Sequence, residues 1–308
     1  MRILITGSRG FVGGSLGRHV ARKGHEVLGI SRAAQPAADW PGPYVTADVV
    51  SADLSQTIRD FAPDAVFHAA GTASVGASFA APLDDFRASL LSWANVLDSV
   101  RRSTLLPLLL FPSSGAVYGQ LTQLPVAEDA AIHPISPYGF HKAACELLAR
   151  EYSNCFGQRI ITCRIFSLFG TAQRRLLIWE LFQQFAGAEH TVWLQGSGSE
   201  TRDYLSVDDM AAAVLGIIEN QNTVMQAGDN LLVNIGSGTE RRVLDLAKQI
   251  GKLVAPEKEI RCRGLKRSGD PARWQADISR LRSLAPDWNP ASFDESLSAC
   301  IAGWQKKS

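Results

Sequence analysis

The stretch TGSRGFVGG, residues 6–14, constrains the fold more than any other part of the sequence. It follows an apolar run, RILIT at 2–6, that is typical of a buried strand, and it leads into a helical pattern at 12–23. Glycine permits a tight turn and a close approach of the backbone to a bound group. The helix start then offers free N–H groups and a partial positive charge to a phosphate. A pyrophosphate-binding turn is therefore predicted at the three spaced glycines, Gly7, Gly10 and Gly13.

Strand and helix patterns alternate from the N-terminus to Phe166. Strand patterns occupy 2–6, 25–30, 44–47, 65–69, 105–111 and 160–166, and helical patterns occupy 12–23, 51–61, 84–102 and 137–156. The strands are apolar throughout, which indicates that both faces of the sheet are covered. This alternation predicts an α/β fold, a Rossmann-type doubly wound parallel sheet with helices on both faces.

The rhythm breaks after Phe166. Helical patterns at 176–185 and 243–253 and a strand pattern at 231–235 are separated by long polar stretches. We expect a smaller C-terminal substrate domain that is interleaved with the first domain. The predicted dinucleotide-binding domain is 1–167 with return segments near 204–235, and the predicted substrate-binding domain is 168–203 and 236–308.

Composition excludes several classes of protein. The chain has 308 residues and a formal net charge of +1, so no overall field favours nucleic acid or a membrane surface. The chain has 5 cysteines and 6 histidines, and they include no CxxC pair and no histidine pair at the spacing of metal ligands. Neither a disulfide framework nor a metal site is therefore indicated. MRILITG is too short for a secretion signal, and no apolar run reaches the ~18–20 residues of a membrane span. We expect a cytoplasmic protein without metal.

The second strand pattern ends in GISRAA, where NAD-selective folds usually carry an acidic residue for the ribose 2′-hydroxyl. Ser31 and Arg32 stand there instead, and an arginine can pair with the 2′-phosphate of NADP. Arg9 in the glycine loop is a second candidate for that phosphate. The alternative is that Arg32 is a solvated surface residue. Asp48 either contacts the adenine amino group or caps the next segment.

The stretch SPYGFHKAACE contains Tyr138 and Lys142, four residues apart and hence on one helix face. Ser113 and Ser114 come after the fifth strand pattern, at the sheet edge where open α/β folds bind ligands. A free tyrosine ionises near pH ~10 and is a poor base at neutral pH. A lysine ammonium ~4 Å away favours the phenolate by on the order of 4 kcal/mol at an effective dielectric near 20. The pattern therefore indicates acid–base chemistry at a carbonyl or alcohol.

Six motifs in this order resemble the extended short-chain dehydrogenase/reductases, the NAD(P)-dependent nucleotide-sugar epimerases, dehydratases and ketoreductases. They are the glycine loop, HAAG (68–71), SSGAVYG (113–119), Tyr138-x-x-x-Lys142, GSGSETRDY (196–204) and RSGD (267–270). The resemblance implies a catalytic set of Ser114, Tyr138 and Lys142. It also implies that a nucleotide-sugar diphosphate is held by Arg202 and Arg267.

The resemblance extends to both binding sites. The residues expected along the cofactor are Gly7, Arg9, Gly10, Phe11, Val12, Gly13, Arg32, Asp48, Val49, Ala69, Ala70 and Gly71, with Tyr138 and Lys142. Those expected at the substrate are Ser74, Ser114, Ser167, Arg202 and Arg267. Ser89 and Ser167 stand where the family often has asparagine, and the loop SLFGTAQRR is short, with Arg174 and Arg175 as alternative phosphate ligands.

The two residues after Ser114 narrow the choice of reaction. Family 4,6-dehydratases carry an acid pair there, whereas this chain has Gly115 and Ala116, so dehydration is not expected. Arg32 favours an NADP(H)-dependent reductase acting on the 4-keto group of a 6-deoxy nucleotide sugar. The first alternative is an NAD(P)-dependent nucleotide-sugar 4-epimerase, and the second is a non-catalytic NADP(H)-binding sensor.

Apolar side chains also gather on the helices at 84–102 and 138–156. They are Leu90, Leu91, Trp93, Leu97, Leu147, Leu148 and Tyr152. In the family that the chain resembles, two such helices form a four-helix dimer interface. We therefore expect a homodimer, and the alternative is that these side chains pack only against their own sheet.

Overall fold

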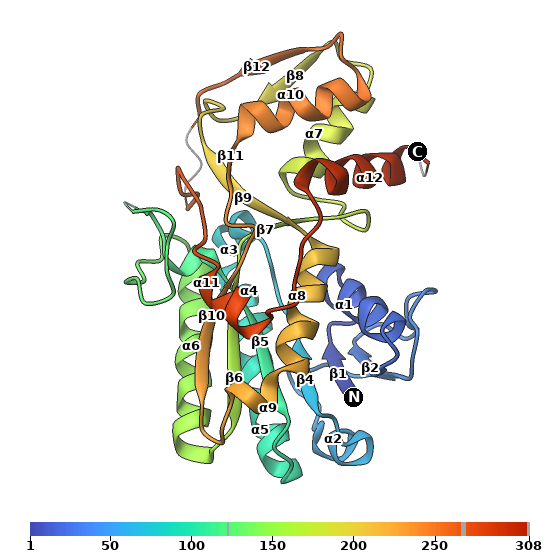
Figure 1. Ribbon diagram of the computed structural model, residues 1–308, viewed down its shortest axis with the longest axis vertical. Coiled ribbons are helices and arrows are strands. Elements are labelled where there is room, and N and C mark those ends of the chain that lie inside the picture. The colour runs from blue at the N-terminus through green and yellow to red at the C-terminus, as the bar shows by residue number, and fades with distance from the viewer. Residues whose placement is uncertain (122, 266–268, 307–308) are drawn as a thin grey trace.

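The structure is a computed structural model that describes residues 1–121, 123–265 and 269–306. Its main sheet is parallel, with the strand order β10-β6-β5-β4-β1-β2-β3 (Figure 1). The strands are β1 (Arg2–Thr6), β2 (Glu26–Ser31), β3 (Tyr44–Thr46), β4 (Ala65–His68), β5 (Leu108–Ser114), β6 (Arg159–Ile165) and β10 (Asn230–Ile235). The order reverses between β1 and β4, where such sheets bind their ligands.

Helices cover both faces of this sheet, as an apolar two-sided sheet requires. One face packs against α1 (Phe11–Arg22), α8 (Val207–Glu219) and α11 (Ser279–Leu284). The other packs against α2 (Ser55–Phe61), α5 (Ser92–Ser103) and α6 (Pro137–Phe156). The prediction of a Rossmann-type doubly wound α/β fold is confirmed.

Several boundaries differ from the sequence patterns. The fifth strand begins at Leu108, directly after Pro107, and it runs on to include Ser113 and Ser114. The expected helix at 51–61 begins only at Ser55. The expected helix at 84–102 is three pieces, which are α4 (Pro82–Phe86), a π-helical turn η1 (Arg87–Leu91) and α5. A short helix, α3 (Val75–Ala80), and a 3₁₀ turn, η2 (Gly115–Val117), were not predicted.

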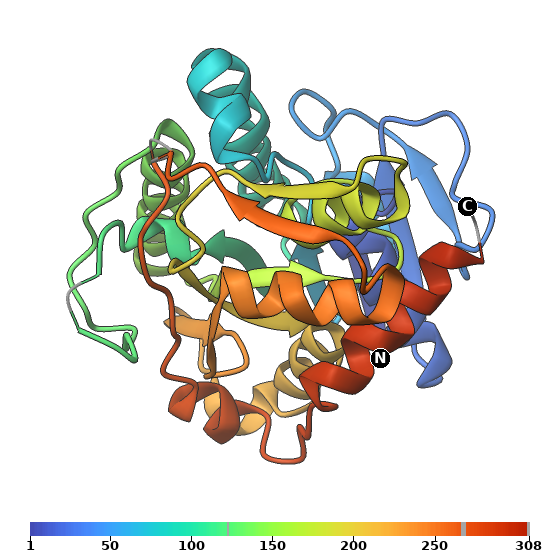
Figure 2. The same cartoon turned by 90° about the horizontal axis from the view of Figure 1, so that it is seen from above.

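A smaller region, which we call the cap, lies beyond the carboxyl ends of the strands (Figure 1). It contains β7 (Ser167–Phe169), β9 (Thr201–Ser206) and β11 (Glu240–Arg242) in one sheet, and β8 (Thr191–Leu194) and β12 (Glu259–Cys262) in another. Its helices are α7 (Leu177–Ala186), α10 (Val243–Val254) and α12 (Phe293–Gln305). Figure 2 shows α10 and α12 side by side over their own core.

The chain leaves the cap to form α8, α9 (Gln221–Val224) and β10 before it returns to β11. The strand β10 pairs with β6 at the edge of the main sheet. Asp203 of β9 accepts hydrogen bonds from the N–H groups of Ser237 (2.7 Å), Gly238 (3.0 Å) and Ala276 (3.0 Å). These bonds tie the crossing segments together, while the division of the chain into two domains stays a prediction.

A buried ion pair holds α6 against the sheet. Arg164 of β6 donates from Nη2 to Oε2 of Glu146 at 2.8 Å and from Nε to Oε1 at 3.1 Å. Ser113 of β5 donates to the same Oε1 at 2.6 Å. The guanidinium also lies 4.7 Å from the ring centroid of Tyr118. Because removing one partner of a buried pair leaves the other charge uncompensated, α6 depends on this cluster for its place.

Replacing Arg164 with Met keeps a long side chain and removes the charge. Glu146 then keeps Ser113 as its hydrogen-bond donor among the described residues, and we expect a loss of about 3–5 kcal/mol of unfolding free energy. Urea denaturation measures this loss. The matched control is Arg261→Met, which breaks the exposed pair between Arg261 and Glu259 and should leave the midpoint near that of the wild type. Equal urea midpoints for Arg164→Met and wild type would contradict the conclusion that the buried ion pair holds α6 in place.

Candidate functional site

The glycine loop forms a close-packed turn between β1 and α1. Gly7 has φ +68°, and a Cβ there would lie 2.5 Å from the amide nitrogen of Ala70, so only glycine fits. The N–H of Gly10 donates to the carbonyl of Gly7 at 2.8 Å. At the start of α1 no side chain caps the helix, and its first turn holds no acidic residue. The N–H groups at Phe11, Val12 and Gly13 thus form the uncapped positive end of a helix, which fits a pyrophosphate.

The end of β4 lies directly beside this loop. Ala69 donates its N–H to the carbonyl of Thr6 at 3.1 Å, and Ala70 donates to the Thr6 hydroxyl at 3.3 Å. His68 is held between the hydroxyls of Thr6 and Ser92. Burial, with a smaller contribution from Lys142, lowers the pKa of His68 to about 3, so the imidazole is neutral. The backbone from Ala69 to Gly71 therefore lines the same edge as the glycine loop.

The end of β2 carries no acidic group. The Ser31 hydroxyl is engaged locally, accepting from the N–H of Ala33 at 3.2 Å and lying 3.0 Å from the Tyr44 hydroxyl. Arg32 is exposed, and residues 31–38 include no carboxylate. Arg9 donates from Nη1 to the carbonyl of Gln35 at 3.1 Å, which brings the glycine loop and the segment after β2 together. This corner therefore presents two guanidinium groups and no carboxylate among residues 31–38.

The third strand ends in a capped turn. Asp48 accepts from the N–H of Val50 at 3.0 Å, so its carboxylate caps the turn before α2. The side chain of Val49 is buried in the core, and its carbonyl accepts from Asn95 at 3.0 Å. Contacts of Asp48 and Val49 with a cofactor stay predictions.

The structure brings the predicted catalytic residues together from β5 and α6. Ser114 ends β5, and its hydroxyl accepts from the N–H of Ala116 at 3.1 Å. The Lys142 ammonium donates to the carbonyl of Pro112 at 2.8 Å and lies 5.7 Å from the ring centroid of Tyr138. Ser114, Tyr138 and Lys142 are each less than a tenth exposed, at 8%, 8% and 6%. The ammonium therefore lies close to the phenol ring, and it is bonded to the strand that ends in Ser114.

The start of α6 is fixed by its local sequence. The Ser136 hydroxyl caps the helix by accepting from the N–H of Gly139 at 3.1 Å, and Pro137 supplies a first residue that needs no hydrogen bond. The N–H of Tyr138 donates to the hydroxyl of Ser78 in α3 at 3.0 Å. The backbone of Tyr138 is therefore tied to the segment after β4.

Sequence reasoning missed Asp85 and His141, which lie beside this cluster. The N–H at Nδ1 of His141 donates to Oδ2 of Asp85 at 2.5 Å, and Thr72 donates to Oδ1. Asp85 is buried and the neighbouring Asp84 is exposed, although nothing in the sequence around them distinguishes the two. The one available signal was His141 itself, inside the SPYGFHK stretch.

On the cap side, Arg202 of β9 is buried and forms an ion pair with Asp270. Its guanidinium carbon lies 5.6 Å from the ring centroid of Trp274, whose ring meets that of Phe166 at 5.5 Å. Phe166 packs near the position of Gly115, which comes directly after Ser114. Trp274 and Phe166 therefore connect Arg202 with the carboxyl end of β5, and sequence reasoning did not identify Trp274.

The other predicted substrate residues have mixed surroundings. Ser74 caps α3 by accepting from the N–H of Ala77 at 3.2 Å, and Ser167 is partly buried in β7. Ser89 is buried in the π-helical turn. Arg174 is engaged by the carbonyls of its own loop and lies over Trp179, whereas Arg175 is exposed. Arg267 lies outside the described residues.

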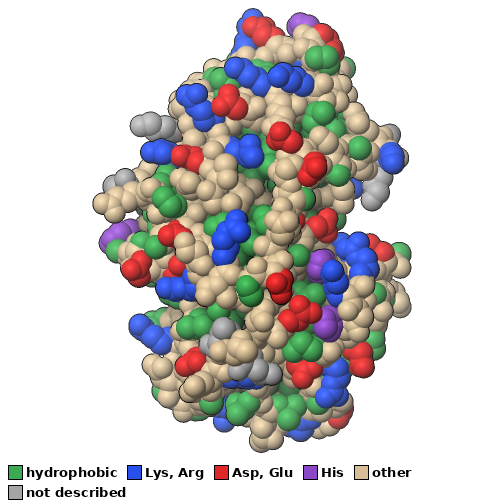
Figure 3. Space-filling view, in the orientation of Figure 1, with side chains coloured by type: hydrophobic (Ala, Val, Ile, Leu, Met, Phe, Trp, Pro, Cys, Tyr) green, Lys and Arg blue, Asp and Glu red, His purple; other side chains and the backbone are tan. Residues whose placement is uncertain are grey.

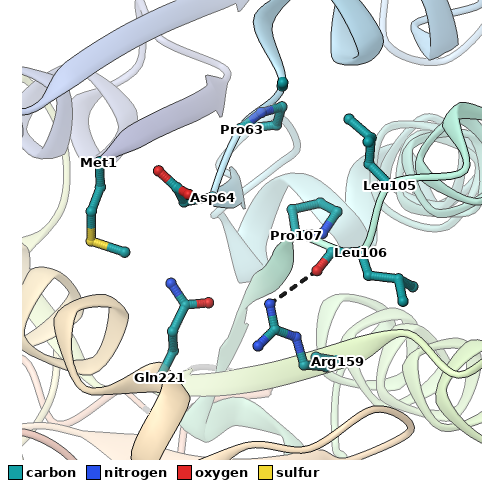
Figure 4. Close-up of a pocket in the computed structure, with 9 residues that line it drawn as sticks. Met1, Pro63, Asp64, Leu105, Leu106, Pro107, Arg159 and Gln221 are labelled. Carbon is teal, nitrogen blue, oxygen red and sulfur yellow. Dashed lines mark hydrogen bonds between the residues drawn. The ribbon is translucent and has the colours of Figure 1, made fainter.

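Other features lie away from this site. A cavity of about 240 Å³ is lined by Met1, Ala62, Pro63, Asp64, Leu105, Leu106, Pro107, Arg159 and Gln221. Figure 4 shows this pocket in close-up. These residues stand mainly at the amino ends of the strands, at the edge of the sheet opposite the predicted site. On the face in Figure 3, basic and acidic side chains are interspersed. Within the described ranges, no three His, Cys, Asp or Glu side chains group as metal ligands, and no helix combines the length and apolarity needed to span a bilayer.

Comparison with known proteins identifies the family. A model of the NAD-dependent epimerase/dehydratase family matches residues 3–236, which include all of the parallel sheet except Arg2. The chain belongs to this family. Membership confirms the resemblance that the motifs carried and the prediction that the protein is an NAD(P)-dependent enzyme.

Relatives of this epimerase/dehydratase family member are named for different activities. A UDP-glucose 4-epimerase of Mycolicibacterium smegmatis is 27% identical over 320 residues, with 100% of each chain covered. A GDP-6-deoxy-D-mannose reductase of Pseudomonas aeruginosa is 28% identical over 321 residues, covering 99% of this chain and 98% of the relative. A UDP-glucuronic acid 4-epimerase of Bacillus cereus, solved with UDP-glucuronic acid and NAD, matches with a TM-score of 0.89, 24% identity and 100% coverage of both chains. The last likeness shows the shared fold.

Proposed function

We propose that the protein is an NADP(H)-dependent reductase of the 4-keto group of a nucleotide sugar, with a 6-deoxy sugar preferred. The observation that carries this proposal is the end of β2, where Arg32 is exposed and residues 31–38 offer no carboxylate. A carboxylate there would repel the 2′-phosphate of NADP, whereas an arginine can pair with it. Selection of NADP(H) suits an enzyme that takes up a reduced cofactor in each turnover.

The chain provides a complete set of groups for this cofactor. The helix start at Gly10 to Gly13 would hold the pyrophosphate, Arg9 and Arg32 the 2′-phosphate, and the backbone from Ala69 to Gly71 the nicotinamide half. When bound, the dinucleotide supplies hydride equivalents for a carbonyl carbon. In that arrangement Tyr138 and Lys142 serve both the cofactor and the reacting oxygen.

The protein's own residues handle the proton. Tyr138 donates its phenolic proton to the carbonyl oxygen as negative charge develops there, and Ser114 donates a hydrogen bond to the same oxygen and orients it. The Lys142 ammonium, 5.7 Å from the ring centroid of Tyr138, stabilises the phenolate that remains. The sheltered position of all three residues strengthens these charge interactions.

The substrate would lie between β5 and the cap. Arg202 and Arg267 are proposed to hold the diphosphate, and Ser74 and Ser167 to contact the sugar. Trp274 lies on the path from Arg202 to Ser114 and offers an apolar ring along the sugar. Gly115 and Ala116 carry no acid beside Ser114, which disfavours the elimination of water.

A 4-epimerase is the second candidate, and the names of several relatives favour it. The Mycolicibacterium smegmatis relative, matched over its full length, is named a UDP-glucose 4-epimerase. An epimerase would keep its cofactor and return the hydride to the opposite face of the sugar. A non-catalytic sensor would have no use for a proton donor, so the intact Ser114, Tyr138 and Lys142 set argues against it.

Changing Tyr138 to Phe tests the proposed proton donor. We expect turnover to fall by ~10²–10⁴-fold because the phenolic proton is lost while the ring is retained. NADPH binding, followed by fluorescence titration, should stay near that of wild type. Leu253→Ala, at an exposed residue of α10 in the cap, serves as a control for handling of the variant. Turnover within a few-fold of wild type would remove Tyr138 from the mechanism.

Changing Arg32 to Asp tests the cofactor and separates the two reactions. Wild type should bind NADPH at least ~10-fold more tightly than NADH, and the variant should reverse this preference, since an arginine–phosphate pair contributes about 1.5–3 kcal/mol. The Lys248→Asp variant, at an exposed residue of α10 in the cap, controls for net charge. Wild type should also oxidise NADPH stoichiometrically with a 4-keto-6-deoxy nucleotide sugar. Tightly retained NAD, with a UDP-sugar epimerised and no net cofactor use, would establish the epimerase instead.

We propose a homodimer through α4–α5 and α6. Leu91 and Leu147 are 43% and 58% exposed, and Phe140 and Phe156 are exposed on the same helix as Leu147. Trp93 and Leu97, which we expected at this interface, are instead fully buried against their own sheet. The surface available to a second copy is therefore smaller than the sequence suggested.

Light scattering at micromolar concentration tests the dimer. Wild type should have the mass of two chains, and Leu147→Glu should have the mass of one, because a carboxylate would be desolvated in the interface. Leu106→Glu, at an exposed leucine outside these helices, is the control. A monomeric mass for wild type would dispose of the dimer.

A further inference from the structure

Asp85 connects two segments whose relative position matters for the proposed function. One is the loop after β4, which contains Gly71, Thr72 and Ser74, and the other is the first two turns of α6, which contain Tyr138 and Lys142. We propose that Asp85 and His141 act as a positioning pair. They hold α6, and with it the proposed proton donor Tyr138, at a fixed place relative to the loop from Gly71 to Ser74. This inference rests on the proposed function, and neither residue is assigned a role there.

The contacts of Asp85 use both carboxylate oxygens. Oδ1 accepts from the Thr72 hydroxyl, and Oδ2 accepts from Nδ1 of His141 at 2.5 Å. The Thr72 hydroxyl lies 3.4 Å from that of Ser89 in the π-helical turn. The ring centroids of His141 and Phe86 lie 5.6 Å apart in a T-shaped arrangement. Asp85 is 3% exposed, so its charge is compensated by these donors and hardly by water. A satisfied buried network of this kind fixes one arrangement of its parts.

The position of His141 on α6 explains what the pair can control. His141 directly precedes Lys142 and comes three residues after Tyr138, so it lies one helical turn beyond the phenol. The face of α6 toward the sheet is held separately, through Lys142 with Pro112 and Glu146 with Ser113. The Asp85 contact holds another side of the helix, where the N–H of Tyr138 also reaches Ser78. Two holds on different sides fix the rotation of α6 about its axis as well as its distance from the sheet.

Loss of the pair should therefore affect the chemical step more than binding. The sheet-side contacts keep Ser114, Tyr138 and Lys142 close to one another, but the loop from Gly71 to Ser74 can shift relative to the phenol. A misplacement of about 1 Å between reacting groups can cost on the order of 10²-fold in rate. The π-helical turn that begins two residues after Asp85 is a local departure of the kind often found at functional sites.

Steady-state kinetics of the full-length enzyme test this inference. The variants are His141→Ala, which removes the donor; His141→Asn, whose amide can donate near the place of Nδ1; Asp85→Ala; and the double alanine variant. We expect kcat to fall roughly 10–100-fold in His141→Ala, with KM and NADPH affinity changed by less than about 3-fold, and His141→Asn to recover most of kcat. The double variant should lose no more than the larger single loss, because the residues act as a unit. Asp84→Ala, at the exposed neighbour, is the matched control.

The outcomes separate this inference from the proposed function. Wild type that turns over neither a 4-keto nucleotide sugar with NADPH nor a UDP-hexose by epimerisation would overturn both. An active wild type with kcat of His141→Ala within about 2-fold of it would overturn only the positioning pair. Equal losses in His141→Asn and His141→Ala would also overturn it, since the ring rather than its hydrogen bond would then matter. Because His141 is partly exposed, the two His141 variants keep the test available if Asp85→Ala fails to fold.

Discussion

The hydrogen bond from the Lys142 ammonium to the carbonyl of Pro112, at 2.8 Å, joins the two elements on which the site depends. It docks α6 on β5, the strand that ends in Ser114, and it keeps the cation beside the Tyr138 ring. A buried ammonium is costly unless its N–H groups have hydrogen-bond acceptors, so the burial of Lys142 depends on the carbonyl of Pro112. The charge that docks the helix is therefore also the one to which we assign a part in the proposed proton chemistry. The Glu146–Arg164 pair one turn further along α6 continues this attachment into β6.

The sequence predicted the parts of the molecule that local chemistry determines. The glycine loop needs Gly7 at a positive φ against Ala70, and the apolar strands need cover on both faces. Tyr138 and Lys142 share a helix face by spacing alone, and Ser114 is placed by the rule that ligands bind at the carboxyl ends of parallel strands. These features are short-range, so one sequence was enough to place them in a Rossmann-type sheet.

The remaining features depend on contacts between distant segments. Asp85 and Asp84 look alike on the sequence, yet only Asp85 is buried, because His141 from another helix lies against it. Trp93 and Leu97 were expected on the surface, but their burial is set by where α5 lies on the sheet. The position of Trp274 could likewise not be predicted, because it depends on contacts with Arg202 and Phe166 from two other segments. The preference for NADP over NAD stays a prediction, since Arg32 is exposed and none of its contacts within the described part of the chain indicates what it binds.

The late position of α8 and β10 in the chain has a consequence for biosynthesis. Both complete the main sheet, β10 by pairing with β6, and α8 by covering the apolar face of which Ile3, Ile5 and Leu110 are part. Until about residue 235 has left the ribosome, that face is covered by α1 without α8, and the edge of β6 is open. Exposed apolar surface and open strand edges are the conditions under which nascent chains aggregate. The cap segments from β7 to β9 precede α8 in the chain, whereas β11, α10, β12 and α12 follow β10. Segments of the two regions therefore alternate along the chain, so neither region is complete until most of the chain has been synthesised.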